Sequence, residues 1–281
     1  MTTALVTDST AYLSPEVVTA RGIGVVPLHV VVGGQERREG VDVGPDEVAE
    51  ALRRFRPVST SRPSPQAFLD VYRELADQGA DSIVSVHISS DMSSTLGSAQ
   101  LAANQSPVPV TVIDSRSMGM AMGYAVLAGA DLASGGASAD EVADVVRARC
   151  AGATVVFYVD TLEHLRRGGR IGKANALLGS ALAIKPILGL DDGAIVPLER
   201  VRTSSRAIAR LEELAVEAAA SAGEVDVAVH HLDSLERAEK LAERLRSRVD
   251  GLGELVVVEL GAVVGAHVGP GTLAIAVSPR T

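Results

Sequence analysis

The first part of the chain alternates short β-branched runs with segments of helical periodicity. The runs are ALVTD, GVVPLHVVV, SIVSVHI, VPVTVID and TVVFYVD, each with the composition of a buried strand. Between the second and third runs, one helical face would carry Phe68, Val71, Tyr72 and Leu75. This spacing predicts a helix that is capped by Ser64 and closed at Gly79. Strands that alternate with helices predict right-handed βαβ units and a mainly parallel sheet.

The second part of the chain has a different pattern. Two strand-like runs flank Asp192 and Gly193, a dipeptide that strongly favours a hairpin. VDVAVHHL, ELVVVEL and TLAIAVS are further predicted strands. An amphipathic helix between them would turn inward Leu235, Ala238, Leu241, Leu245 and Val249. We therefore predict an α/β domain over residues 1–158 and an α+β domain with a mixed sheet over residues 159–281.

Composition narrows the class of protein. Hydrophobic residues make up 47% of the 281 residues, which predicts a folded chain, and the formal net charge is −9. An acidic chain with 2% aromatic residues is unsuited to nucleic acid, which prefers basic stripes and stacking platforms. The single cysteine, Cys150, excludes an internal disulfide and fits a cytoplasmic protein. We expect no signal peptide and no integral membrane span, because no uncharged apolar run approaches about 18 residues.

Hydroxyl-rich segments follow or precede predicted elements at several points. STSRPS spans Ser59–Ser64, and SSDMSST spans Ser89–Thr95 after a strand. Both lie near predicted helix N-termini, where free N–H groups and a partial positive charge favour anions. Such residues bind a carboxylate or phosphate in some proteins and only cap helices in others. Both interpretations remain open at this point.

The basic stretch RRGGRIGKA, residues 166–174, is not a nucleotide-binding loop. A Walker motif needs four residues between its glycines and a hydroxyl after the lysine, whereas three residues separate Gly168 from Gly172 and Ala174 follows Lys173. The cations would either interact with a ligand or partner or simply end a helix. The chain also has no G-x-S-x-G elbow, no G-x-G-x-x-G after its first strand and no H-E-x-x-H.

Two histidine-bearing segments are candidate sites. His230, His231 and Asp233 could contact a metal, although a strand end that carries histidines by chance is the better explanation, because their spacing matches known metal sites only loosely. GAHVGPGTLAI places His267 in a predicted glycine-rich loop, where backbone can approach a ligand closely. Considered alone, His267 is either a ligand contact or a structural turn residue.

Seven segments together resemble the DegV family, the bacterial fatty-acid-binding subunits of fatty acid kinase. They are VTDSTAYL (6–13), TSRPSP (60–65), ISSDMSSTLGSA (88–99), DSRSMGMAMG (114–123), LEHLRRGGRIGK (162–173), RVRTSSRAI (200–208) and GAHVGPG (265–271). They occur in the family's order and span nearly the whole chain. The resemblance implies a Rossmann-like first domain, an α+β second domain and a long-chain fatty acid buried between them.

The resemblance also implies roles for individual residues. The fatty-acid carboxylate would be held by Thr60, Ser61, Ser93, Ser94 and His267. Arg170 and Arg202 would face a separate ATP-dependent kinase subunit or the acyl phosphate. The chain would need no cofactor and no metal, because phosphoryl transfer would use the partner's metal and nucleotide. It would then carry the acyl phosphate towards phospholipid synthesis.

The sequence departs from the family's usual pattern at a few positions. Tyr12 replaces an acidic residue, Arg62 replaces a common Gln, and Ala266 replaces a Pro. Asp91, Ser94 and Leu96 stand where Gly, Gly and Tyr are usual. Two other functions remain alternatives: a self-sufficient esterase that uses Ser93 with His267, and a non-catalytic lipid-responsive regulator.

Overall fold

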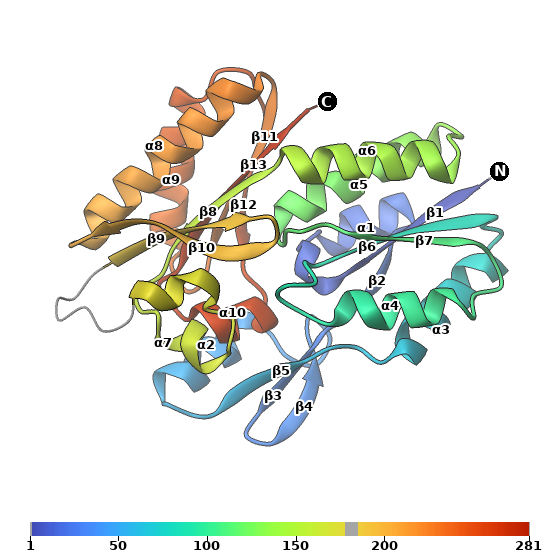
Figure 1. Ribbon diagram of the computed structural model, residues 1–281, viewed down its shortest axis with the longest axis horizontal. Helices are drawn as coiled ribbons and strands as arrows, with labels where there is room; N and C mark the ends of the chain where they lie inside the picture. The colour runs from blue at the N-terminus through green and yellow to red at the C-terminus, as the bar shows by residue number, and fades with distance from the viewer. Residues whose placement is uncertain (1, 178–184, 281) are drawn as a thin grey trace.

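The computed structural model describes residues 2–177 and 185–280 (Figure 1). A sheet of order β2-β1-β6-β7 lies in the first part of the chain, and each of its three strand pairs is parallel. Its strands are β1 (Thr3–Asp8), β2 (Gly24–Val26), β6 (Ser82–His87) and β7 (Val110–Asp114). The helices that connect or follow them are α1 (Pro15–Arg21), α3 (Pro65–Asp77), α4 (Thr95–Ala103), α5 (Met120–Ser134) and α6 (Ala139–Gly152). The predicted mainly parallel sheet is confirmed.

Helix α3 forms for the reasons that its sequence suggests. The Ser64 hydroxyl accepts a hydrogen bond from the Ala67 N–H at 3.2 Å, and a proline occupies the first turn. Phe68 and Tyr72 are fully buried on the face that packs against the parallel sheet. The chain leaves the helix through Gly79, whose φ of +99° favours glycine.

A six-stranded mixed sheet forms the second part of the molecule, in the order β10-β9-β8-β13-β11-β12. Its strands are β8 (Thr154–Tyr158), β9 (Lys185–Asp191), β10 (Ala194–Val201), β11 (Val225–His231), β12 (Leu252–Glu259) and β13 (Leu273–Pro279). The predicted β9–β10 hairpin is confirmed, and both Asp192 and Gly193 have positive φ. Strand β8 comes from the predicted first domain, 1–158, yet pairs with β9 and β13. The division of the chain into two domains stays a prediction.

Helices α8 (Ser204–Ala222) and α9 (Leu235–Arg248) pack together on this six-stranded sheet (Figure 1). Ala238, Leu241 and Leu245 are fully buried, as predicted from the periodicity. The prediction for Leu235 is wrong, because its side chain is 52% exposed. At about 100° per residue, Leu235 lies roughly 75° from the centre of the apolar stripe, in the first turn of the helix.

Helices α5 and α6 contact both larger sheets and so join the two parts of the molecule. The Tyr124 hydroxyl on α5 donates to the Val227 carbonyl at 2.9 Å. Arg149 on α6 forms a buried ion pair with Asp226 on β11. The carboxyl ends of the parallel strands are thereby fixed relative to the six-stranded sheet.

A third, three-stranded antiparallel sheet of order β4-β3-β5 was not predicted. It consists of β3 (His29–Val32), β4 (Gln35–Arg38) and β5 (Val58–Ser61). The interpretation of GVVPLHVVV as one strand is wrong: β2 ends before Pro27, which has no N–H to continue a ladder, and β3 belongs to the other sheet. Val30 of β3 and Val48 of α2 (Pro45–Arg53) lie in one apolar cluster with residues of α10 (Ala262–Val268).

The segment around His267 is a helix and not the predicted glycine-rich loop. Helix α10 continues to Val268, and positive φ occurs only after it, at Gly269 and Gly271. The remaining short elements are the α-helix α7 (Glu163–Arg167) and two 3-10 helices, η1 (Ser9–Ala11) and η2 (Gly172–Leu177). The predicted basic loop therefore includes the end of one helix and the start of another.

Candidate functional site

A mainly apolar cavity of about 240 Å³ lies where the six-stranded sheet meets α10 and the loops after the parallel strands. Strands β8 and β9 contribute Val155, Phe157 and Leu190 to its wall. Helix α10 contributes Val263, Val264 and Val268. A hydrocarbon ligand in this cavity would remove its apolar lining from water, which is favourable. The lining therefore favours an apolar ligand.

Polar groups from four separate segments also line this cavity. Of the residues predicted from the sequence, it brings together Thr60, Ser61, Ser93, Ser94, Arg170 and His267. Arg202, which lies between β10 and α8, is exposed and does not line the cavity. Arg62, noted above only as a departure from the family's pattern, lines it as well. The expected head-group residues therefore share one cavity, although their roles stay predictions.

The central contact of the site joins Thr60 on β5 to His267 on α10. Thr60 Oγ1 lies 2.8 Å from His267 Nε2. Burial, with a smaller contribution from the Arg170 guanidinium, lowers the pKa of His267 to about 4. The imidazole is therefore neutral at neutral pH. With the proton on Nε2, His267 donates to Thr60, and the threonine hydroxyl is free to donate to a ligand.

Close packing with Gly168 fixes the other side of the imidazole ring. A Cβ atom at Gly168 would lie 2.0 Å from His267 Nδ1. Nδ1 is buried and has no hydrogen-bond partner among the described residues. Only a glycine leaves room for the ring in this orientation, which explains the glycine at position 168 of the RRGG segment.

The Ser89–Thr95 loop brings Ser93 to the cavity. Ser93 Oγ lies 2.8 Å from Thr95 Oγ1 and accepts a longer bond, of 3.3 Å, from the Thr95 N–H. The β9–β10 hairpin holds this loop from outside, since Ser89 Oγ donates to the Gly193 carbonyl at 2.9 Å. Ser93 thus bonds to the first residue of α4 and also lines the cavity, whereas Ser94, at the N-cap position, makes no side-chain capping bond.

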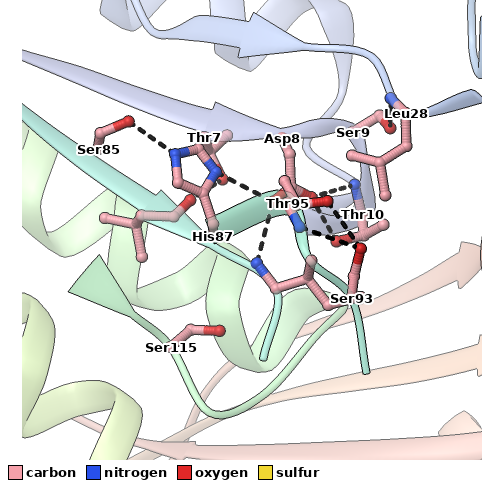
Figure 2. A network of polar contacts seen from close by, with 12 residues as sticks. Thr7, Asp8, Ser9, Thr10, Leu28, Ser85, His87, Ser93, Thr95 and Ser115 are labelled. Carbon is pink, nitrogen blue, oxygen red and sulfur yellow. Dashed lines mark hydrogen bonds and ion pairs between the residues drawn. The ribbon is translucent and has the colours of Figure 1, made fainter. Parts of the chain in front are cut away.

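A buried network at the end of β1 supports the same loop (Figure 2). The Asp8 carboxylate accepts hydrogen bonds from the Ile88 N–H at 2.9 Å and from Thr10. His87 lies between Asp8 and Ser85, with its nitrogens 3.1 Å and 2.7 Å from their oxygens. This Ser–His–Asp arrangement is fully buried and does not line the apolar cavity, so it orients Ile88 and does not present a nucleophile to a ligand there.

Arg170 is part of the cavity wall. Its Nε donates to the Met92 carbonyl at 3.0 Å and its Nη1 to the Gly168 carbonyl at 2.8 Å. These bonds connect the basic segment after α7 to the Ser89–Thr95 loop. Its Nη2 has no hydrogen-bond partner among the described residues.

A second, more polar cavity of about 520 Å³ lies on the other side of the same contact. It shares Thr60, Arg170 and His267 with the apolar cavity. Arg56 and Arg167 add further positive charge to its wall. The head-group residues therefore separate an apolar cavity from a more polar one.

Other candidate chemistry receives less support. Within residues 2–177 and 185–280, no three His, Cys, Asp or Glu side chains gather as a metal site. His230 accepts a hydrogen bond from the Met120 N–H at 3.0 Å at the start of α5, which gives it a structural role. Ser93 bonds to Thr95, and His267 bonds to Thr60, so the esterase pair is not formed. No described helix is long and apolar enough to cross a membrane.

Comparison with known proteins gives concordant results. The family model DegV, described as "Uncharacterised protein, DegV family", matches residues 2–280. A DegV domain-containing protein of Streptomyces coelicolor is 52% identical over 277 residues, which cover 99% of this chain and 98% of that protein. Protein DegV of Bacillus subtilis is 35% identical over 285 residues and 98% of each chain.

Solved structures are similar along the whole chain. The DegV family protein from Thermus thermophilus, described by its fatty acid binding, has a TM-score of 0.94 at 33% identity, with 100% of both chains covered. DegV from Bacillus subtilis, described as a fatty acid binding protein, has a TM-score of 0.91 at 33% identity, with the same coverage. A stearic acid-binding protein from Eubacterium ventriosum has a TM-score of 0.89 at 25% identity, covering 98% of this chain and 97% of that one.

Proposed function

The chain belongs to the DegV family, and from this premise we propose that it binds one long-chain fatty acid in the apolar cavity. The observation that carries the proposal is the contact between Thr60 and His267 beside an otherwise apolar wall. Similar proteins of solved structure are described as fatty-acid-binding. The acyl chain would lie against the valines of α10 and the side chains of β8 and β9.

The carboxylate would accept hydrogen bonds from the hydroxyls of the site. The candidates for these donors are Thr60, Ser61, Ser93 and Ser94. His267 would act mainly through Thr60, because its Nε2 is engaged with that hydroxyl and its Nδ1 faces Gly168. Arg170 would supply positive charge, since it forms no salt bridge with a carboxylate among residues 2–177 and 185–280.

The energetics favour a carrier. Each buried methylene contributes about 0.8 kcal/mol, so a C16 tail contributes roughly 12 kcal/mol before the costs of association. Such a ligand leaves slowly, and only its head group needs to meet a second protein. We propose that this partner is an ATP-dependent fatty acid kinase subunit, reached from the polar cavity that contains Arg56 and Arg167. The carrier would retain the acyl phosphate for phospholipid synthesis.

Delipidated protein titrated with palmitate tests the binding proposal. We expect saturation at one palmitate per chain. Failure to bind palmitate or oleate would leave the non-catalytic regulator as the better account, and hydrolysis of an activated ester by the protein alone would favour the esterase.

A further inference from the structure

Glu39 is a buried carboxyl group that the sequence did not single out. Glu39 is 5% exposed, and no basic side chain among the described residues forms an ion pair with it. It accepts a hydrogen bond from the Ser9 hydroxyl and another, of 2.8 Å, from the Val263 N–H. A buried acid without a cation is costly to keep, so an arrangement of this kind calls for a role.

Both hydrogen-bond partners of Glu39 belong to, or bond to, residues that line the apolar cavity. Val263 lines the cavity from α10. Ser9 Oγ also accepts a 3.0 Å hydrogen bond from the N–H of Leu28, which lines it from the segment before β3 (Figure 2). The backbone N–H of Glu39 donates to the Leu28 carbonyl at 2.8 Å. Glu39 therefore connects two walls that come from distant parts of the chain.

The central contact of the site joins α10 to β5, the strand that pairs with β3. Val263 and His267 are four residues apart on α10, about one helical turn. Leu28 immediately precedes β3, and β3 pairs with β5 so that Val30 lies opposite Thr60. A change in the distance between α10 and β3 would also change the distance between His267 and Thr60.

We infer that Glu39 is a positioning residue for the carboxylate site: it holds α10 against the three-stranded sheet so that His267 orients the Thr60 hydroxyl. The inference rests on the proposed fatty-acid function. It concerns the head group in particular, because the tail contacts a much larger wall than the two residues that Glu39 holds.

The electrostatic surroundings agree with this role. Burial, partly offset by the bonds from Ser9 and Val263, raises the pKa of Glu39 to about 7, and the nearby Asp8 adds to the increase. Tyr12 faces it from the end of η1, and burial and the Glu39 charge raise the pKa of that phenol. The group thus changes its charge in the neutral range, where its hold on the two donors changes with it.

The test compares two ligands that share a tail and differ in head group. Palmitate and hexadecanol are titrated into the parent, Glu39→Ala, Glu39→Gln and Ser9→Ala. We expect Glu39→Ala to weaken palmitate at least tenfold more than hexadecanol. Glu39→Gln keeps a carbonyl acceptor for Val263 and should restore most of the palmitate affinity. Ser9→Ala should show a smaller loss with the same preference, and it decides the matter if Glu39→Ala does not fold.

Glu212→Ala is the matched control, since this glutamate is also 5% exposed but pairs with Arg244 and Arg248 far from the cavity lining. It should lower the melting temperature and leave both affinities unchanged. Equal losses for palmitate and hexadecanol, or no loss for either, would overturn the inference. A parent protein that binds neither ligand would overturn the proposed function itself.

Discussion

Replacing Gly168 by alanine should disturb the carboxylate site through a single added methyl group. The backbone accepts alanine without strain, because Gly168 has φ −74° and ψ −8°. Its Cβ would lie 2.0 Å from His267 Nδ1 and 2.7 Å from Cε1. The ring must therefore move by more than about 1 Å, since non-bonded atoms of this kind rest roughly 3.5 Å apart.

The ring has no room to move towards its partner. The bond from His267 Nε2 to Thr60 is already 2.8 Å long, near the short end of such bonds. Displacement therefore breaks this bond, and the threonine hydroxyl loses its orientation towards the carboxylate. A lost hydrogen bond to a charged group costs about 1.5–3 kcal/mol. This corresponds to palmitate binding that is roughly 10- to 150-fold weaker.

Displacement of a fluorescent fatty acid from delipidated protein measures this loss. Gly97→Ala is the control, because a Cβ at Gly97 meets no atom within 4 Å. The double variant Gly168→Ala/His267→Ala should bind no more weakly than His267→Ala alone, since both changes remove the same interaction. Parent-like affinity in Gly168→Ala, or additive losses in the double variant, would refute this account of the ring's position.

Three further predictions concern other parts of the site. Thr60→Ala with Ser93→Ala should reduce palmitate affinity in part and leave the melting temperature within a few degrees; unchanged affinity by fluorescence displacement would make both hydroxyls purely structural. Burial raises the pKa of Glu39 from 4.5 to about 7, so the folded state binds this proton more tightly than the unfolded state does. The resulting stabilisation is complete below pH 4.5 and is lost as pH rises through about 7. Relative to Glu39→Gln, the parent should lose about 3 kcal/mol of unfolding free energy over that interval, at 1.36 kcal/mol per pKa unit. Urea denaturation measures this free energy at each pH, and the same pH dependence in both proteins would contradict the prediction. Arg202→Ala should preserve palmitate binding and slow coupled phosphorylation by the cognate kinase, so unchanged turnover would remove Arg202 from the partner surface.

The elements with regular patterns could be predicted from the sequence. The periodicity of residues 64–79 and the Asp192–Gly193 turn are local signals, and both are confirmed in the structure. The three-stranded sheet could not be predicted, because β3 is short and follows a strand of another sheet after only Pro27 and Leu28. Its pairing with β5 depends on contacts across about 30 residues, which no local pattern encodes.

The site could be predicted in part. The family resemblance indicated Thr60, Ser93, Arg170 and His267, and the structure places all four in one cavity wall. Glu39 could not be found in this way, because a glutamate after a basic strand predicts an exposed position. Its burial arises only when α10, more than 200 residues later, packs against it.

Native mass spectrometry of freshly purified protein tests the central claim most directly. The account predicts a chain that carries one additional mass equal to that of a long-chain fatty acid, which organic extraction removes and added palmitate restores. A chain that is empty when purified and that stays empty after exposure to palmitate and oleate would contradict it.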